Sequence, residues 1–274
     1  AVARFPIGLT PGALCHHLLY YSLGVTPKNK LETKNPEFDY ECRGLESVAT
    51  LKKRFAAMKV YFVLSAETRV ENAFLLSIAG APDAIDRLVA SVKQWAGRYG
   101  FDGLFVHWLN PLVWSQAKPF FGNLSRQLRP NYTFGVILPR ERRYLKNYNV
   151  MELFPMVDWM IATTHGFSSP EKSNVTSCYS PFTNGKKNTM RGQIIFLDNA
   201  LGKSIDLAKF CFTVSARSVG YTVTGTGSEY RMKASGPGNL TRYTGIPGVL
   251  AYSQVCRLGR RAKGVEKKYC AYMR

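Results

Sequence analysis

The sequence predicts an α/β fold in which a mostly parallel sheet is covered by helices. Its 274 residues are too many for a minimal domain and fit one large α/β barrel. Hydrophobic residues make up 46% and charged residues 20%, which is ordinary globular composition with ample material for a core. Short apolar runs alternate with amphipathic stretches, as in repeated strand–helix units.

The predicted strands are short runs that are apolar on both faces, as in a parallel sheet with helices on its surface. They cover residues 18–23, 59–64, 104–108, 132–138, 157–162 and 210–214.

Helix candidates lie between these runs. Residues 84–97 place an apolar stripe at helical spacing, with Asp83 as the expected cap and Gly97 and Gly100 marking the exit. Residues 204–209 read as the end of another helix.

The amino-acid composition of the chain changes after Tyr221. Residues 225–228 and 236–241 are rich in Gly, Ser and Thr, which indicates a loop-rich or small α+β segment. We therefore expect a barrel core over residues 1–222 and an insertion-like α+β segment over residues 223–274.

The chain is strongly basic. It contains 37 Lys and Arg residues and 18 Asp and Glu residues, which gives a formal charge of +19. This excess favours polyanionic partners such as nucleic acid, anionic membrane or sulfated polysaccharide. Two clusters are candidate polyanion-binding sites, and 259–264 has a spacing common in heparin-binding stretches. The candidates are Arg257, Arg260, Arg261, Lys263, Lys267, Lys268, Arg140, Arg142 and Arg143. The alternative is a solvated helix face.

Cysteines and glycosylation motifs together predict export. The six cysteines, none with zinc-ligand spacing, are disulfide candidates in an exported protein: Cys15, Cys42, Cys178, Cys211, Cys256 and Cys270. Four sequons predict N-glycosylation at Asn123, Asn131, Asn174 and Asn239. Buried free thiols in a cytosolic protein are the alternative. Export argues against a nucleic-acid partner, no apolar run is long enough for a membrane span, and no metal or cofactor is expected.

The string over residues 99–111 carries a family resemblance. It is similar to the fourth-strand signature of family-18 glycoside hydrolases, the chitinase family, F-D-G-x-D-x-D-W-E-Y-P. Phe101, Asp102, Gly103, Trp108 and Pro111 match that signature. The three later acidic positions hold Phe105, His107 and, in place of the catalytic Glu, Leu109.

Further segments extend the resemblance over residues 13–256. Residues 15–21 resemble the second strand, 148–159 the approach to the sixth, and 234–238 with 248–256 the inserted α+β domain. The resemblance implies a (β/α)8 barrel. Its first strand is absent or shortened to about residues 2–5, and its eighth has no visible counterpart. Proximity in the expected fold suggests Cys178–Cys211 and Cys256–Cys270 bridges, leaving Cys15 with Cys42.

The same resemblance predicts a protein that does not hydrolyse chitin. In the family's mechanism a Glu protonates the glycosidic oxygen while an Asp positions the acetamido group of the substrate. Leu109 has no proton to give, and the sixth-strand Tyr–Asp pair corresponds to His165 and Gly166. His107 and His165 as acid and base are the alternative, although the sequence identifies no partner carboxylate for either. A metal pair at His16 and His17 is disfavoured because adjacent strand residues face opposite sides.

Two functions remain. The first is a non-catalytic, secreted chitinase-like protein that binds acidic or sulfated glycans, such as glycosaminoglycans, through its basic surface. The second is a scaffold for protein partners built on an inactive barrel. A weak chito-oligosaccharide lectin and a residual hydrolase rank behind them.

Overall fold

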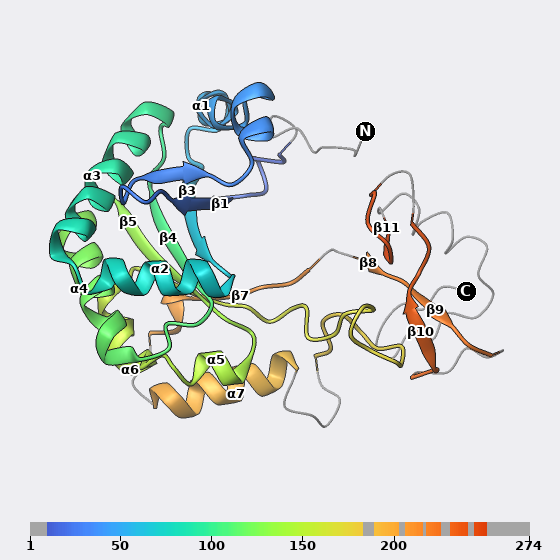
Figure 1. The fold of residues 1–274 in the computed structure, drawn as a ribbon. Helices are drawn as coiled ribbons and strands as arrows, with labels where there is room; N and C mark the ends of the chain where they lie inside the picture. The colour runs from blue at the N-terminus through green and yellow to red at the C-terminus, as the bar shows by residue number, and fades with distance from the viewer. Residues whose placement is uncertain are drawn as a thin grey trace. The chain divides into compact units, whose positions relative to one another are not determined.

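The structure is a computed structural model that describes residues 10–182, 189–202, 206–215, 218–225, 231–240 and 244–250. Its contacts divide the chain into two compact units (Figure 1). The sheet unit comprises residues 5–163 and 199–211, and the second unit comprises residues 1–4, 164–198 and 212–274. The domain boundary expected at residue 222 stays a prediction.

One seven-stranded sheet organises the sheet unit, with the order β2-β1-β3-β4-β5-β6-β7. Neighbouring strands from β1 to β6 pair in parallel, and only β2 returns antiparallel beside β1. The strands are β1 (His17–Val25), β2 (Leu31–Thr33), β3 (Lys59–Ala66), β4 (Gly103–Trp108), β5 (Thr133–Leu138), β6 (Trp159–Ala162) and β7 (Phe210–Phe212). The six predicted strands are confirmed, with β7 shorter than expected.

Helices connect the strands and cover the sheet (Figure 1). They are α1 (Gly44–Arg54), α2 (Arg69–Ala79), α3 (Pro82–Tyr99), α4 (Trp114–Leu128), α5 (Arg142–Leu145), α6 (Val150–Leu153) and α7 (Met190–Leu201). Short turns of π- or 3-10 helix occur at η2 (Glu37–Glu41), η3 (Phe154–Met156) and η4 (Leu207–Lys209). The helix end expected over residues 204–209 is wrong in part, because α7 stops at Leu201 and η4 is a separate turn.

The predicted helix over residues 84–97 is α3, but its expected cap is wrong. The helix begins at Pro82, whose fixed φ suits a first helical position, so Ala81 is the N-cap and Asp83 lies within the first turn. Gly97 lies inside the helix. Gly100 ends it with φ 77°, a left-handed conformation that favours glycine.

The continuous apolar runs are explained by burial of both sheet faces. On the inner face, Phe105 packs with four other side chains in one buried cluster: Tyr61, Val63, Ile137 and Ile161. On the outer face Phe62 stacks on Phe101 with ring centroids 3.6 Å apart, and Trp108 packs edge-on against Phe120 of α4.

Two aspartates fix the starts of neighbouring strands. The Asp102 carboxylate, one residue before β4, accepts hydrogen bonds from the Val60 backbone N–H and from Lys52 Nζ, each at 2.8 Å. Asp158, one residue before β6, accepts from the Phe134 N–H at 2.9 Å and from Arg129 Nε at 3.0 Å. Each aspartate therefore ties its own strand to its neighbour.

The second unit contains short antiparallel pairs. Strand β8 (Ser218–Val219) pairs with β11 (Val249–Leu250), and β9 (Tyr221–Val223) pairs with β10 (Ala234–Pro237). A bridge between Val175 and Lys233 joins the segment after β6 to β10. The expected first strand over residues 2–5 and residues 251–274 lie outside the described residues.

Two suggested disulfides are wrong. Cys15 and Cys211 are free thiols, so neither the Cys15–Cys42 nor the Cys178–Cys211 bridge is present. Cys178 and Cys211 belong to different compact units. The suggested Cys256–Cys270 pair lies outside the described residues. Within the part of the chain that is described, no helix combines the length and apolar character needed to cross a bilayer.

We predict that Asp102→Ala lowers the free energy of unfolding by about 1–3 kcal/mol, because it leaves the Val60 N–H without its partner. Burial alone would raise the pKa of Asp102, but Lys52, the Val60 N–H and Lys59 hold it below its usual range. A lowered carboxyl pKa stabilises the fold above the unfolded-state pKa, and that contribution disappears on acidification. The difference between variant and wild type should therefore shrink below about pH 4.

Urea unfolding at neutral pH and at pH 3 measures this effect. Asp198→Ala, at an exposed position of α7, is the control and should stay within about 0.5 kcal/mol of wild type. Equal unfolding midpoints for Asp102→Ala and wild type would contradict the proposed role.

Candidate functional site

Every second residue of β4 points to the inner face of the sheet, and the last of these residues lie at the rim formed by the carboxyl ends of the strands. Residues 105, 107 and 109 share a face because side chains alternate along a strand. Phe105 is buried, and its ring occupies the space that a side chain on Gly135 of β5 would need. His107 follows toward the end of β4. Leu109 lies just beyond the strand and is half-buried, and its backbone N–H donates to the Ala66 carbonyl at 2.9 Å.

Asp102 does not join these residues. It precedes β4, at the opposite end of the strand, where its carboxylate contacts Lys52 and Lys59. The aspartate that matches the start of the motif therefore has a role in strand pairing.

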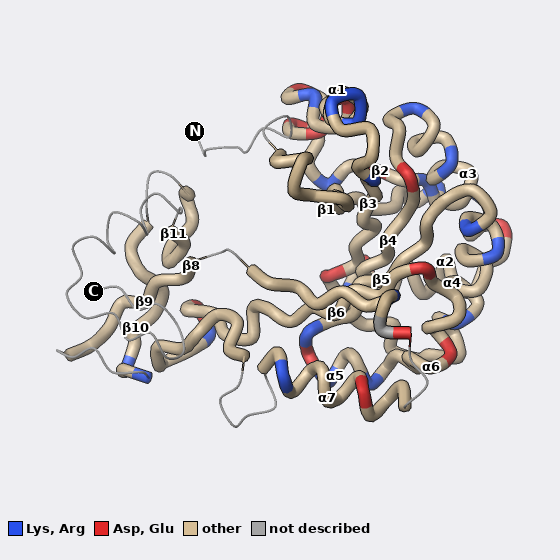
Figure 2. The backbone as a smooth tube through the Cα atoms, turned by 180° about the vertical axis from the view of Figure 1, so that it is seen from behind, with Lys and Arg blue, Asp and Glu red and all other residues tan. Residues whose placement is uncertain are grey.

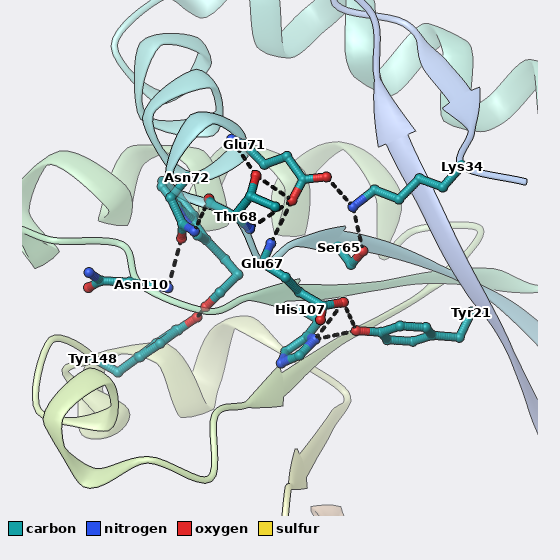
Figure 3. A network of polar contacts seen from close by, with 11 residues as sticks. Tyr21, Lys34, Ser65, Glu67, Thr68, Glu71, Asn72, His107, Asn110 and Tyr148 are labelled. Carbon is teal, nitrogen blue, oxygen red and sulfur yellow. Dashed lines mark hydrogen bonds and ion pairs between the residues drawn. The ribbon is translucent and has the colours of Figure 1, made fainter. Parts of the chain in front are cut away.

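A polar network lies where β3 and β4 end, and Tyr21 from the middle of β1 joins it (Figure 3). The Tyr21 hydroxyl donates to Glu67 Oε1 and lies 2.7 Å from His107 Nδ1. Because the single phenol proton goes to Glu67, Nδ1 of His107 must be the protonated nitrogen that donates to Tyr21. In neutral His107, Nε2 is then a hydrogen-bond acceptor.

Glu67 is the carboxylate partner of His107 that the sequence did not reveal. Its Oε1 lies 4.0 Å from His107 Nδ1. Burial lowers the pKa of His107, and the charges of Arg140 and Lys34 act in the same direction, while Glu67 opposes them. His107 is therefore neutral at neutral pH. Tyr21 is also kept protonated, since burial and Glu67 raise its pKa.

A second carboxylate beside this group is fully paired. Glu71 lies 2.5 Å from Lys34 Nζ, which also donates to Ser65 Oγ at 2.9 Å. Glu71 further accepts from the backbone N–H groups of Glu67 and Thr68, closing a capping box at the start of α2. Burial alone would raise the pKa of Glu71, but Lys34 and these donors lower it to about 2.

Further hydrogen bonds fix the loop after β4. Asn72 Oδ1 accepts from the Asn110 N–H at 2.8 Å, and Asn147 Nδ2 donates to Asn110 Oδ1 at 2.6 Å. The buried Tyr148 hydroxyl donates to the Trp108 carbonyl. The rim is therefore held by side chains from several segments.

Tyr21, Glu67 and His107 present mainly acceptor atoms, and the cations Lys34 and Arg140 lie near them. The Glu67 side chain is 46% exposed, and the residue Tyr21 beside it is 53% exposed. Together with Nε2 of His107 they suit a ligand that donates hydrogen bonds, such as a sugar hydroxyl, and offers an apolar face to an aromatic ring. Among the described residues there is no cluster of three or more His, Cys, Asp or Glu that could hold a metal.

Tyr21 and Glu67 are functional candidates that the sequence reasoning missed. Tyr21 belongs to a predicted strand and Glu67 directly follows another one. Polar side chains at the carboxyl ends of parallel strands are the available signal, because those ends converge at one rim.

Of the remaining predicted site residues, Arg140 lies near enough to His107 for its charge to lower the pKa of that imidazole. His165 and Gly166 belong to the second unit, where His165 Nδ1 lies 2.7 Å from Thr213 Oγ1. His17 stands at the start of β1, stacked on Tyr61, and both it and its neighbour His16 are exposed. Of the basic candidates, Arg140 and Arg143 both pair with Glu141, and Arg142 begins α5. The cluster over residues 257–268 lies outside the described residues.

Three of the four predicted glycosylation sites are exposed: Asn131, Asn174 and Asn239. Asn123 lies within α4, where its side-chain oxygen accepts from Arg126 at 3.0 Å. The exposed three therefore fit the surface position that an attached glycan needs.

Comparison with known families settles the relationship. The sequence profile of the glycosyl hydrolases family 18 matches residues 3–273. The chain belongs to family 18. Among its relatives, human chitinase-3-like protein 2 is 21% identical over 266 residues, covering 91% of this chain and 67% of that protein. Chitinase-like protein EN03 of Bombyx mori is 22% identical over 297 residues, covering 92% and 68%.

Solved structures confirm the predicted barrel fold of this family-18 chain. The group IV chitinase of Ostrinia furnacalis superposes with a TM-score of 0.79 at 17% identity, covering 91% of this chain and 72% of that one. Human YKL-39, described as a pseudo-chitinase with retained chitooligosaccharide binding properties, gives 0.79 at 18% identity, covering 95% and 74%.

We predict that Glu67→Gln lowers the pKa of His107 further, because it removes the one charge that favours the imidazolium. An NMR titration of the His107 ring measures this, with the other three histidines as internal references. Glu46→Gln, at an exposed position paired with Arg43, is the matched control. A His107 pKa that stays constant or rises in Glu67→Gln would contradict the geometry.

Proposed function

We propose that this family-18 protein is an exported glycan-binding protein that does not hydrolyse its ligand and prefers acidic or sulfated glycans. The observation that carries the proposal is the inward face of β4. Phe105, His107 and Leu109 leave no carboxyl group on that strand where the family's reaction needs its acid.

Glu67 does not replace the missing acid. It accepts a hydrogen bond from Tyr21 and belongs to the segment after β3, so it acts as an acceptor rather than as a proton donor. His107, in the position of the acetamido-binding Asp, is a neutral imidazole beside a phenol. These contacts support binding without bond cleavage.

The preference for acidic glycans rests on charge. The formal charge of +19 concentrates polyanions at the surface. A sulfate group only accepts hydrogen bonds, so the acceptor-lined rim of Tyr21, Glu67 and His107 does not suit it. We therefore assign acidic glycans to Lys and Arg side chains outside that rim.

We predict that the protein elutes from a heparin column at higher salt than from a cation exchanger of matched charge density. Clustered cations that fit sulfate groups add specific hydrogen bonds, whereas generic charge does not. Neutralising Arg260, Arg261 and Lys263 to Gln tests the heparin-type spacing of residues 259–264. Co-elution of the wild type from both columns would refute the preference and favour a scaffold for protein partners.

Chito-oligosaccharide binding at the rim is the second candidate function, favoured by the exposed Tyr21 ring beside two acceptors. The described property of YKL-39 gives it support by analogy. We predict that Tyr21→Ala and Glu67→Gln each weaken chitotetraose binding by about tenfold in calorimetry, the cost of one stacking or hydrogen-bond contact. The wild type should release no shorter oligosaccharides. Measured turnover would overturn the non-hydrolytic assignment, and unchanged affinity in both variants would exclude this rim.

Glycosylation is tested by the mass of the secreted protein. Expression with a secretory signal in eukaryotic cells should give a mass that falls on treatment with an N-glycosidase. Substituting Asn131, Asn174 and Asn239 by Gln should abolish that change. A protein that leaves the cell without attached glycan would contradict the glycosylation part of the proposal.

A further inference from the structure

The fold gathers basic residues at the end of the sheet opposite to the Tyr21–Glu67–His107 rim. Helices α1, α3 and α4 each end shortly before the next strand begins. Their last turns therefore meet the N-terminal ends of β3, β4 and β5. These turns carry Lys and Arg but no Asp or Glu, and Figure 2 shows blue segments on α1 and α3.

Printed contacts join these turns into one surface. Lys52, near the end of α1, donates to the Gly100 carbonyl after α3 at 2.8 Å and also to Asp102. The Asp102 carbonyl accepts from the N–H of Thr133, the first residue of β5. Arg129, after α4, contacts the Pro155 carbonyl at 2.9 Å and Asp158. The contacts run continuously from α1 to the start of β6.

We propose that this end of the sheet unit, here called the basic end, binds the sulfated glycan of the proposed function. It consists of six exposed cations: Lys53, Arg54, Lys59, Arg98, Arg126 and Arg129. This inference rests on the proposed function, since it assigns a place to the acidic ligand.

The charge balance at the basic end favours an anionic ligand. The carboxylates in its connecting segments, Asp102 and Asp158, are already paired with Lys52 and Arg129. Cations at helix C-termini also interact with the helix dipole, but that effect is local to each helix. The alternation of helices and parallel strands brings the three helix ends together, and a linear polyanion can contact all three at once.

The character of the surface favours a polysaccharide over a membrane. Membrane-surface helices need large apolar side chains that insert into the lipid. In the last turns of α1, α3 and α4, Leu51, Tyr99 and Leu128 are buried, and none of the exposed large apolar residues lies in these turns. Tyr40 is exposed near Arg98, but a single phenol is no lipid-inserting face. Guanidinium and ammonium groups on such a surface suit sulfate groups spaced along a hydrophilic chain.

Four neutralising substitutions at the basic end test the assignment: Lys53→Gln, Arg54→Gln, Arg98→Gln and Arg126→Gln. They spare Lys52, Lys59 and Arg129, which pair with aspartates. The control removes the same charge at four exposed positions elsewhere, Lys28, Lys30, Arg69 and Lys93. Asn131 follows α4 at the basic end, so both variants and the wild-type reference carry Asn131→Gln.

The combined substitution should weaken heparin binding in calorimetry by about 10- to 100-fold, as expected for losing several charge-assisted contacts. The control should change it by less than about threefold, through net charge alone. Equal losses in both variants would overturn the placement while the proposed function stands. A parent that binds heparin no better than a generic cation exchanger does would instead refute the proposed function.

Lysine acetylation of the parent protein gives a second measurement that does not depend on the folding of the variants. Bound heparin should protect Lys53 and Lys59 from acetylation, read by peptide mass spectrometry, and leave Lys28 and Lys30 reactive. Equal reactivity of Lys53 with and without heparin would overturn the placement.

Discussion

The Asp102 carboxylate links the elements on which the rest of the sheet unit depends. It bonds the backbone of β3 and the ammonium group of Lys52 on α1, and it immediately precedes β4. With Asp102 fixed, the alternation of β4 places Phe105 in the core and His107 at the far rim. Asp158 repeats the arrangement between β5 and β6. Asp102, the first acidic residue of the family motif, is therefore explained by its role in strand pairing. Its presence in this chain does not indicate that the chain hydrolyses a substrate.

The loss of acidic residues along β4 changes both the core and the rim. Phe105 fills the interior and requires a glycine opposite, at Gly135. One step further, the neutral imidazole of His107 takes its orientation from Tyr21, which is itself bonded to Glu67. A carboxylate thus persists at the rim, supplied by the segment after β3. Its Oε1 accepts the hydrogen bond that the Tyr21 phenol donates.

The sequence predicted the strands well because each is a continuous apolar run, and burial on both faces of the sheet produces that pattern. It predicted the body of α3 from helical spacing, but not its start, because Pro82 outweighed the capping preference of Asp83. The family resemblance located Phe105, His107 and Leu109. It could not locate Tyr21 and Glu67, since their proximity to His107 depends on the register of three strands distant in sequence. The suggested cysteine pairs that involve Cys15 and Cys211 failed for the same reason: proximity in a general fold does not fix the distance between two side chains.

The two ends of the sheet present opposite chemistry, and helix polarity explains why. Helices α1, α3 and α4 each end shortly before a parallel strand begins, so their C-termini stand at the basic end, while α2 begins at the rim just after β3. Acidic side chains stabilise helix N-termini and basic side chains stabilise C-termini. Glu71 in the first turn of α2 and Arg98 in the last turn of α3 follow this rule. In most α/β proteins the resulting charge separation is slight. At the basic end the exposed charged side chains in the last turns of α1, α3 and α4 are all cations, whereas at the rim the Glu67 and Glu71 carboxylates stand beside Lys34 and Arg140. Under the proposed function, a neutral sugar would therefore bind at the rim and a sulfated glycan at the basic end.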